Sequence, residues 1–162
     1  MKKNDFGYEQ VNKDEHYNKV QEVFNNVANE YDFMNDVMSF GLHRNWKKEF
    51  VGLIEINDEN DTKILDLAGG TGDIAKRILK SHPNTSIEII DKNFMMLKES
   101  STKDNILKSN KINLICGDGE NIPLNDNSTD VITLSFGIRN MTDRIKCLKE
   151  CYRVLKPGGQ FL

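Results

Sequence analysis

The stretch Lys63–Asp73, with the sequence KILDLAGGTGD, decides the fold of this chain. Its first five residues, KILDL, form a short apolar run that predicts a buried β-strand. The glycine turn Gly69–Asp73 lets the backbone approach a ligand closely, and the helix expected after it begins with free N–H groups. A strand, a glycine turn and a helix in this order are typical of the first unit of an α/β domain that binds a cofactor.

Strand and helix patterns alternate from this turn to Leu162. The further strands are expected at Ser86–Asp91, Ile112–Cys116, Asp130–Phe136 and Gln160–Leu162. The sequence predicts a helix with Ile74, Ile78 and Leu79 on one face and a second helix capped by Asn93. A third is capped by Thr142, ends at Lys156–Gly159 and carries Ile145, Leu148, Tyr152 and Leu155 on one face. Such repeated units predict a parallel sheet with helices on both faces.

The residues before this unit have a different pattern. Residues 1–17 predict a polar, extended leader, and apolar spacing from Val20 to Tyr31 predicts a helix. A second helix follows Gly41, with Trp46, Phe50 and Leu53 on one face. The polar linker Asn57–Thr62 separates the two parts. We therefore expect a helical lid segment over residues 1–57 and a Rossmann-like core over residues 58–162.

Composition excludes several classes of protein. The 162 residues suit about one domain, and 38% hydrophobic with 29% charged residues is an ordinary globular balance. A net charge of -3 argues against a nucleic-acid binder. The N-terminal residues form neither a secretory signal nor a visible transit peptide. The three cysteines, Cys116, Cys147 and Cys151, form no CxxC pair and are expected to be packing residues.

Acids at the ends of the predicted strands narrow the choice of cofactor. Asp91, at the end of the second strand, can accept both hydroxyls of a ribose, which suits a nicotinamide enzyme or an S-adenosylmethionine enzyme about equally. Asp66, just before the glycines, would repel a pyrophosphate but favour the ammonium group of S-adenosylmethionine. Asp118, two residues after the third strand, would lie beside the adenine. Together these residues indicate the cofactor edge of a class I methyltransferase.

Four blocks of the sequence resemble the ubiquinone/menaquinone biosynthesis C-methyltransferase family. They are Tyr31–Trp46, Leu65–Asp73, Gly117–Asn140 and Arg153–Gly159. The first block and the FGIRN segment, Phe136–Asn140, are more specific than the glycine turn. The resemblance covers nearly the whole chain from Phe6 onward, and two short segments resemble the mitochondrial, ubiquinone-type branch. These segments are Phe6–Tyr8 and Gly159–Leu162.

The resemblance implies a class I fold with strand order 3-2-1-4-5-7-6 and S-adenosyl-L-methionine as methyl donor. The methionine end would be held by Gly69, Gly70, Thr71 and Gly72. Asp91 would hold the ribose, Asp118 and Gly119 the adenine side, and Ser135 would contact the cofactor near the end of the fourth strand. Gly119 stands where the family usually has Ala. Because the chain stops in its fifth strand, we expect the C-terminal strands to be missing and strand four to be a hydrophobic edge.

The substrate that the resemblance implies is a polyprenylated benzoquinol or naphthoquinol, methylated on a ring carbon. Arg139 is the main candidate for stabilising a developing phenolate, because its guanidinium stays charged, and Asn140 would orient the ring. Tyr31 is a second candidate from the N-terminal block, and His43 is expected to act as a base or to cap a helix. Four apolar residues are expected either to line a channel for the prenyl tail or to pack in the core: Met34, Met38, Phe40 and Trp46.

Three readings stay open from the sequence alone. The favoured one is methylation of a benzoquinol in ubiquinone biosynthesis, with demethylmenaquinol as the other possible acceptor. The second is a nicotinamide-dependent oxidoreductase, and the third is a non-catalytic, shortened scaffold with the same fold. The resemblance implies other quinone-biosynthesis enzymes as partners, a peripheral membrane contact on the matrix side of the inner mitochondrial membrane and a possible homodimer, with no nucleic acid.

Overall fold

A five-stranded parallel sheet forms the centre of the computed structural model, which describes residues 4–6, 9–12, 15, 18–19, 22–23, 37–56, 61–103 and 109–162. The strands are β3 Lys63–Leu67, β4 Ser86–Asp91, β5 Ile112–Cys116, β6 Thr129–Thr133 and β7 Leu155–Phe161. They lie in the order β5-β4-β3-β6-β7, with every neighbouring pair parallel. Counted along the chain this is 3-2-1-4-5, so the predicted topology is confirmed for these strands.

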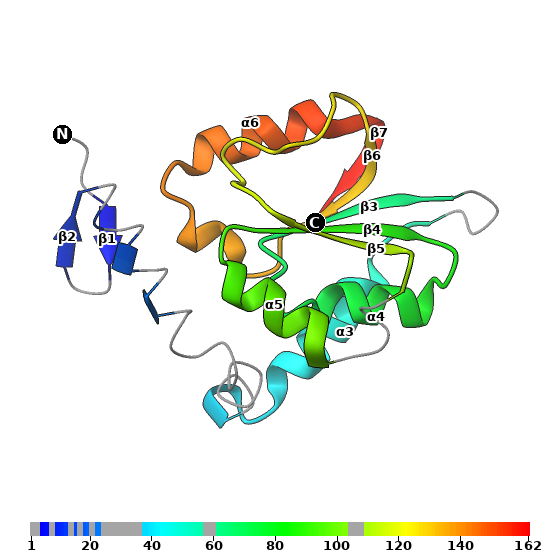
Figure 1. The fold of residues 1–162 in the computed structure, drawn as a ribbon. Helices are drawn as coiled ribbons and strands as arrows, with labels where there is room; N and C mark the ends of the chain where they lie inside the picture. The colour runs from blue at the N-terminus through cyan, green and yellow to red at the C-terminus, as the bar shows by residue number, and fades with distance from the viewer. Residues whose placement is uncertain are drawn as a thin grey trace.

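Helices cover both faces of the sheet, as predicted (Figure 1). One face carries α3 Leu42–Gly52, α4 Asp73–Ser81 and α5 Phe94–Lys103, and the other carries α6 Arg144–Val154. A short 3-10 helix, η2 Gly137–Asn140, follows β6. Near the N-terminus, β1 Asn4–Phe6 and β2 Glu9–Val11 pair as an antiparallel hairpin, so the leader that was expected to be extended has paired strands.

The two faces of the sheet build two hydrophobic cores. Successive side chains of a strand point to opposite faces, so neighbouring residues enter different cores. Ile64 of β3 packs toward α3 and α4, whereas Leu65 packs toward α6. Val131 and Ile132 of β6 divide in the same way. A sheet that is buried on both faces explains why its central strands are nearly continuous apolar runs.

The predicted buried face of α6 is wrong. Ile145, Leu148 and Tyr152 are exposed, Tyr152 to 85%, whereas the face toward the sheet carries Cys147, Cys151 and Val154. The helix also begins one residue later than expected, because the Asp143 side chain, not that of Thr142, accepts a hydrogen bond from the Lys146 N–H at 3.1 Å. Burial confirms Cys147 and Cys151 as packing residues, whereas Cys116 is exposed and the same expectation is wrong for it.

The apolar face predicted for α3 is correct only for Phe50, which packs against the core. Trp46 and Leu53 are more than half exposed, and the buried positions of α3 are His43, Lys47 and Val51. The helix therefore turns a histidine and a lysine inward. A search for apolar spacing misses this pattern, because the buried polar groups are held by specific partners rather than by hydrophobic packing.

Two strand limits differ from the expected ones. β6 ends at Thr133, because Phe136 adopts a left-handed backbone with φ 59° that a strand cannot contain. β7 begins at Leu155, so the predicted stop Lys156–Gly159 lies inside a strand, beside a register shift in its pairing with β6. Because β6 is paired on both sides, the expectation that it forms a hydrophobic edge is wrong, and β7 lies at the edge of the described sheet.

One side chain ties the last strand to the segment after α3. The Gln160 Nε2 donates to the Leu53 carbonyl oxygen at 2.8 Å, and its Oε1 accepts from the Glu55 N–H at 3.0 Å. Most of the helix expected over Val20–Tyr31 and part of the expected linker lie outside the described residues. The division into residues 1–57 and 58–162 therefore stays a prediction.

Candidate cofactor and substrate site

A cavity of about 430 Å³ opens at the carboxyl ends of the central strands. Its walls come from the segments that follow β3, β4, β5 and β6, and α3 closes one side. Strands β4 and β6 flank β3: the chain passes from β3 outward through β4 to β5 and then crosses back to place β6 on the other side of β3. Cofactors bind to open α/β sheets at such switch points. The topology therefore places the candidate site where the glycine turn predicted it.

The glycine turn packs tightly enough to require its glycines. A Cβ atom on Gly69 would lie 2.7 Å from the Asp66 Oδ2 and 2.7 Å from the Ile89 Cγ2, closer than atoms can pack. Gly70 has φ 54°, in the left-handed region that favours glycine. The Gly72 N–H closes the turn on the Gly69 carbonyl at 2.9 Å. The backbone between β3 and α4 therefore lines the cavity directly, without side chains at Gly69 and Gly70.

Asp66 is a buried acid that lines the cavity. It is 1% exposed, and its Oδ1 accepts a hydrogen bond from the Thr133 hydroxyl at 2.8 Å. The other oxygen, Oδ2, has no hydrogen-bond partner in the described structure. Burial raises the pKa of this carboxyl from 3.8 to about 7, although the bond from Thr133 and the nearby backbone N–H of Ala75 lower it. A buried carboxyl with an unpartnered oxygen is suited to receive a cation from the cavity.

Asp91 links the glycine turn to the start of α5. Its Oδ2 accepts from the Gly70 N–H at 2.9 Å, and its Oδ1 accepts from the Asn93 N–H at 2.8 Å. Burial raises its pKa, and these two backbone bonds act in the opposite direction. Asn93 caps α5 as predicted, accepting from the Met96 N–H at 3.0 Å. Since a carboxylate oxygen accepts more than one hydrogen bond, Asp91 keeps capacity for ribose hydroxyls.

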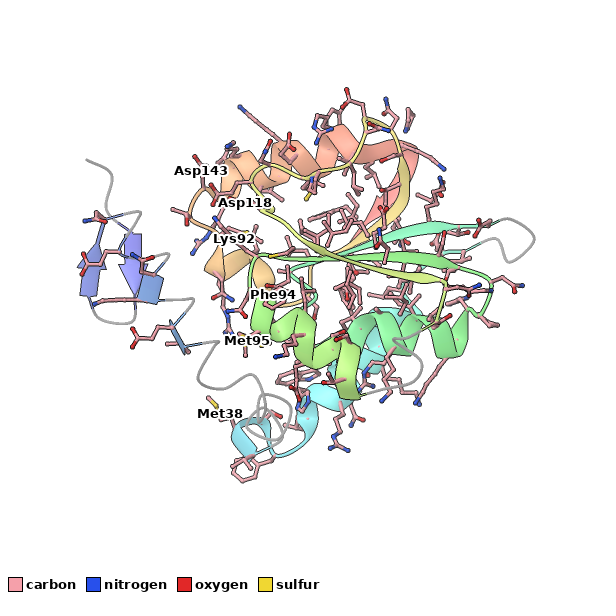
Figure 2. The ribbon with its side chains drawn as sticks, in the orientation of Figure 1. Met38, Lys92, Phe94, Met95, Asp118 and Asp143 are labelled. Atoms are coloured by element: carbon pink, nitrogen blue, oxygen red, sulfur yellow. The ribbon has the colours of Figure 1, made fainter. Side chains whose placement is uncertain are left out.

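Asp118 lies at the rim of the same cavity, after β5. Figure 2 shows it beside Lys92, whose Nζ donates to its Oδ2 at 2.7 Å, and its Oδ1 accepts from the Glu120 N–H at 2.9 Å. Partial burial raises the pKa of Asp118, but the bond and charge of Lys92 outweigh it and hold the pKa below its ordinary value. Asp118 is therefore an ionised acceptor. Gly119 lines the cavity next to it.

A further part of the cavity wall comes from the FGIRN segment and the residue before it, Ser135. Gly137 packs against the turn, and a Cβ atom there would lie 2.6 Å from the Ala68 Cβ. Ser135, Arg139 and Asn140 all line the cavity. In the described part of the chain, the Arg139 side chain forms no ion pair, and its backbone carbonyl accepts a 3.4 Å bond from Arg144. The alternative that Arg139 is paired with a helix carboxylate has no support in these residues.

The α3 region closes the cavity from the N-terminal side. Met38, His43 and Trp46 line it, whereas Phe40 is 94% exposed and does not. His43 is buried, with its Nδ1 2.8 Å from the Ser39 Oγ, and the N-cap position of α3 is held by Gly41. The expectation that His43 caps the helix is therefore wrong. Tyr31 and Met34 lie outside the described residues.

The cavity brings together every other site residue that the sequence predicted. These are Asp66, Gly69, Gly70, Thr71, Asp91, Asp118, Gly119, Ser135, Arg139 and Asn140, with Gly72 as the N-cap of α4 beside them. Their roles in binding stay predictions. Sequence reasoning missed Thr133, the partner of Asp66, and Lys47, whose Nζ lies 2.8 Å from the Asp73 Oδ2. Lys47 stands four residues after His43, a spacing that places both on one helix face.

The residues present fit S-adenosyl-L-methionine better than a dinucleotide. The unpartnered Asp66 oxygen suits an ammonium group, whereas two acids beside the glycine turn, Asp66 and Asp91, would oppose a pyrophosphate. Sheet order, glycine turn and acids together define the class I methyltransferase fold. The chain belongs to the ubiE/COQ5 methyltransferase family, whose sequence profile matches residues 10–162.

Curated relatives extend over the same residues. The mitochondrial 2-methoxy-6-polyprenyl-1,4-benzoquinol methylase of Caenorhabditis elegans is 44% identical over 98% of this chain and 56% of its own length. The ubiquinone/menaquinone biosynthesis C-methyltransferase UbiE of Methylobacterium nodulans is 43% identical over 98% of this chain and 63% of its own length. The chain thus spans about 56–63% of these two relatives.

A solved structure supports the fold over nearly all of the chain. It is a putative S-adenosyl-L-methionine-dependent methyltransferase of Methanococcus maripaludis, with a TM-score of 0.63 and 20% sequence identity. The match covers 99% of this chain and 65% of that one. Family and fold imply S-adenosyl-L-methionine as the cofactor. Among the described helices, each is too short or too polar to cross a membrane.

Proposed function

We propose that the protein represented by this chain methylates a ring carbon of a polyprenylated benzoquinol in ubiquinone biosynthesis. The observation that carries the proposal is that one cavity is lined by two kinds of side chain. Acids and glycines at the ends of β3, β4 and β5 form one set, and Arg139, Met38 and Trp46 form the other. The first set suits a cationic cofactor, and the second suits a hydroxylated ring with an apolar tail.

The cofactor would supply a methyl group on a positively charged sulfur. In the chain itself, Asp91 would hold the ribose hydroxyls, and Asp118 the exocyclic amine of the adenine. Thr71, Gly119 and Ser135 would contact the cofactor along the same wall. Asp66 would face the ammonium of the methionine part. Burial raises the pKa of this carboxyl to about 7, and a neighbouring positive charge would stabilise its ionised form.

Arg139 would act on the quinol. Attack by a ring carbon needs electron density that a neighbouring hydroxyl provides once it loses its proton. A guanidinium stays protonated at any physiological pH, so Arg139 would stabilise the phenolate oxygen rather than accept the proton. Asn140, next to it on η2, would orient the ring. Tyr31 and His43 remain the candidates for the proton acceptor.

The Arg139→Ala variant tests this assignment. We expect it to bind S-adenosylhomocysteine as tightly as the unchanged chain, because Arg139 is separate from the acids that would hold the cofactor. Turnover with a short-tailed 2-methoxy-6-prenyl-benzoquinol should fall by about 10²–10³-fold, the loss typical of removing one oxyanion donor. Mass spectrometry of the methylated product measures it. Undiminished turnover would remove Arg139 from the mechanism.

A naphthoquinol acceptor is the second candidate. The relatives named for ubiquinone and menaquinone biosynthesis support it. The same assay with a demethylmenaquinol analogue separates the two substrates by their ratio of kcat/KM. Tight cofactor binding without methylation of either quinol would favour the non-catalytic scaffold, and tight NADH binding would favour the oxidoreductase.

We also propose a location on the matrix side of the inner mitochondrial membrane, supported by the mitochondrial name of the Caenorhabditis elegans relative. A prenylated quinol partitions into membranes, so the protein would contact the bilayer peripherally and meet other quinone-biosynthesis enzymes there. A homodimer belongs to the same proposal. Fractionation of mitochondria with carbonate extraction tests the peripheral contact, because a peripheral protein is released into the carbonate supernatant.

A further inference from the structure

Lys47 is a nearly buried lysine at the boundary between α3 and the sheet domain. Its side chain is 9% exposed, and its Nζ donates to the Asp73 Oδ2 at 2.8 Å. Asp73 is the first residue of α4, directly after the glycine turn. A buried ammonium is costly unless it is paired, so a charge at this position needs a reason beyond packing.

The charges around Asp73 leave a positive excess. The Arg77 Nε donates to the other carboxylate oxygen, Oδ1, at 3.1 Å. Although partial burial raises the pKa of Asp73, the bonds and charges of Lys47 and Arg77 hold it below its ordinary value, so this acid is ionised at neutral pH. One carboxylate between two cations leaves one positive charge uncompensated in this triad. Of the two cations, Lys47 lines the cavity and Arg77 does not.

Lys47 lines the cavity and has further donor capacity. An ammonium group carries three N–H donors, and among the described residues the bond to Asp73 takes one of those on Lys47. The other two cations that line the described cavity stand elsewhere, because Lys92 pairs with Asp118 at the rim and Arg139 follows β6. Beside the glycine turn, a negative group in the cavity therefore meets Lys47.

We propose that Lys47 binds the α-carboxylate of the methionine part of S-adenosyl-L-methionine. The amino-acid end of that molecule is a zwitterion, and the glycine turn lies between an acid with an unpartnered oxygen, Asp66, and this cation. The assignment rests on the proposed cofactor. It makes α3 a part of the cofactor site, so that the N-terminal segment and the sheet domain hold the same molecule.

Two ligands that differ only in their amino-acid part test the proposal. S-Adenosylhomocysteine carries the carboxylate, whereas 5′-methylthioadenosine keeps the adenosine and the sulfur but has no amino acid. Lys47→Met removes the charge and keeps the length of the side chain. By isothermal titration we expect its affinity for S-adenosylhomocysteine to fall by roughly 10–100-fold, as for loss of a hydrogen bond to a charged group. Its affinity for 5′-methylthioadenosine should change by less than about twofold.

Arg77→Met is the matched control, since it removes the other cation of Asp73 but leaves the cavity lining intact. Both ligands should bind this variant within about twofold of the unchanged chain. Equal loss of both ligands in Lys47→Met, or no loss of either, would overturn the proposal, because Lys47 would then support the fold alone or not contribute. Binding of 5′-methylthioadenosine reports that the variant is folded.

The outcome is separable from that of the proposed function. An unchanged chain that binds S-adenosylhomocysteine in a Lys47-dependent way but methylates no quinol would overturn the proposed reaction and uphold the role of Lys47. A folded chain that binds neither ligand would overturn the cofactor site and the role of Lys47 with it.

Discussion

Asp66 is a residue whose protonation links stability to pH. Its pKa is about 7 in the folded chain and near the ordinary 3.8 in the unfolded chain. Between these values the folded state holds a proton that the unfolded state has released. The contribution of Asp66 to the free energy of unfolding is therefore fully present below pH 3.8 and falls as the pH rises toward 7. Burial thus makes an ionised Asp66 unfavourable until a cation joins it.

Asp66→Asn should abolish this dependence. The amide stays neutral at every pH, and its oxygen still accepts from Thr133. We expect the variant to be more stable than the unchanged chain at pH 8 and closest to it at pH 4, as measured by urea unfolding. A stability difference that does not change between pH 4 and pH 8 would show that Asp66 has an ordinary pKa. Titration with S-adenosylhomocysteine should show weaker binding by Asp66→Asn, since the ammonium group of the ligand loses a charged partner.

At the scale of elements, the sheet follows from the sequence and the helix faces do not. The limits of β3, β4 and β5 agree with those predicted, because each is a short run rich in Ile and Leu that turn or polar residues bound. α6 has apolar residues on more than one face, so spacing alone chose Ile145, Leu148 and Tyr152. The sheet instead receives small cysteines, Cys147 and Cys151, which carry little weight in a search for large apolar residues.

The candidate site was also predictable only in part. Residues at and just after the strand ends, such as Asp66 and Asn140, were predictable because the topology fixes which strand ends meet. Lys47 was not, since its place depends on how α3 docks against α4. Such a long-range ion pair has no local signature. Thr133 was hidden for a related reason, because its partner Asp66 lies on the neighbouring strand, 67 residues earlier in the chain.

A pair of substitutions on α6 tests the corrected face. Val154→Ala removes methyl groups from a fully buried position and should lower the free energy of unfolding by about 1–3 kcal/mol. Tyr152→Ala, on the exposed face two residues away, should change it by less than about 0.5 kcal/mol. Chemical denaturation of both variants measures the difference. A larger effect for Tyr152 would mean that this face of α6 is covered in solution.

At the scale of the whole molecule, Gln160 connects parts that the sequence separates widely. Its two hydrogen bonds hold the segment after α3 against β7, on the side of the sheet domain away from the cavity. α3 itself is attached through the Lys47–Asp73 ion pair at the cavity and through Val51, which packs into the core on that face of the sheet. The helix is thus held at its middle and just after its C-terminal end, and its docking sets the shape of the cavity wall.

Gln160→Ala should loosen that attachment. Loss of two hydrogen bonds at a partly exposed site costs about 1–2 kcal/mol. Amide exchange of Glu55 should become faster, because its N–H loses the Gln160 acceptor, whereas exchange in β3 should stay unchanged. Hydrogen exchange followed by mass spectrometry measures both segments in one experiment. Uniformly faster exchange would mean that Gln160 supports the sheet as a whole instead of α3.

The same tie has a consequence for how the protein is made. Glu55 leaves the ribosome 105 residues before Gln160. At about 5–20 residues per second, the segment after α3 waits roughly 5–20 s for its partner. During that interval the Leu53 carbonyl and the Glu55 N–H lack the side chain to which they bond in the finished fold. The nascent chain is therefore most open to chaperones, and to mispairing, in the time between the synthesis of α3 and that of β7.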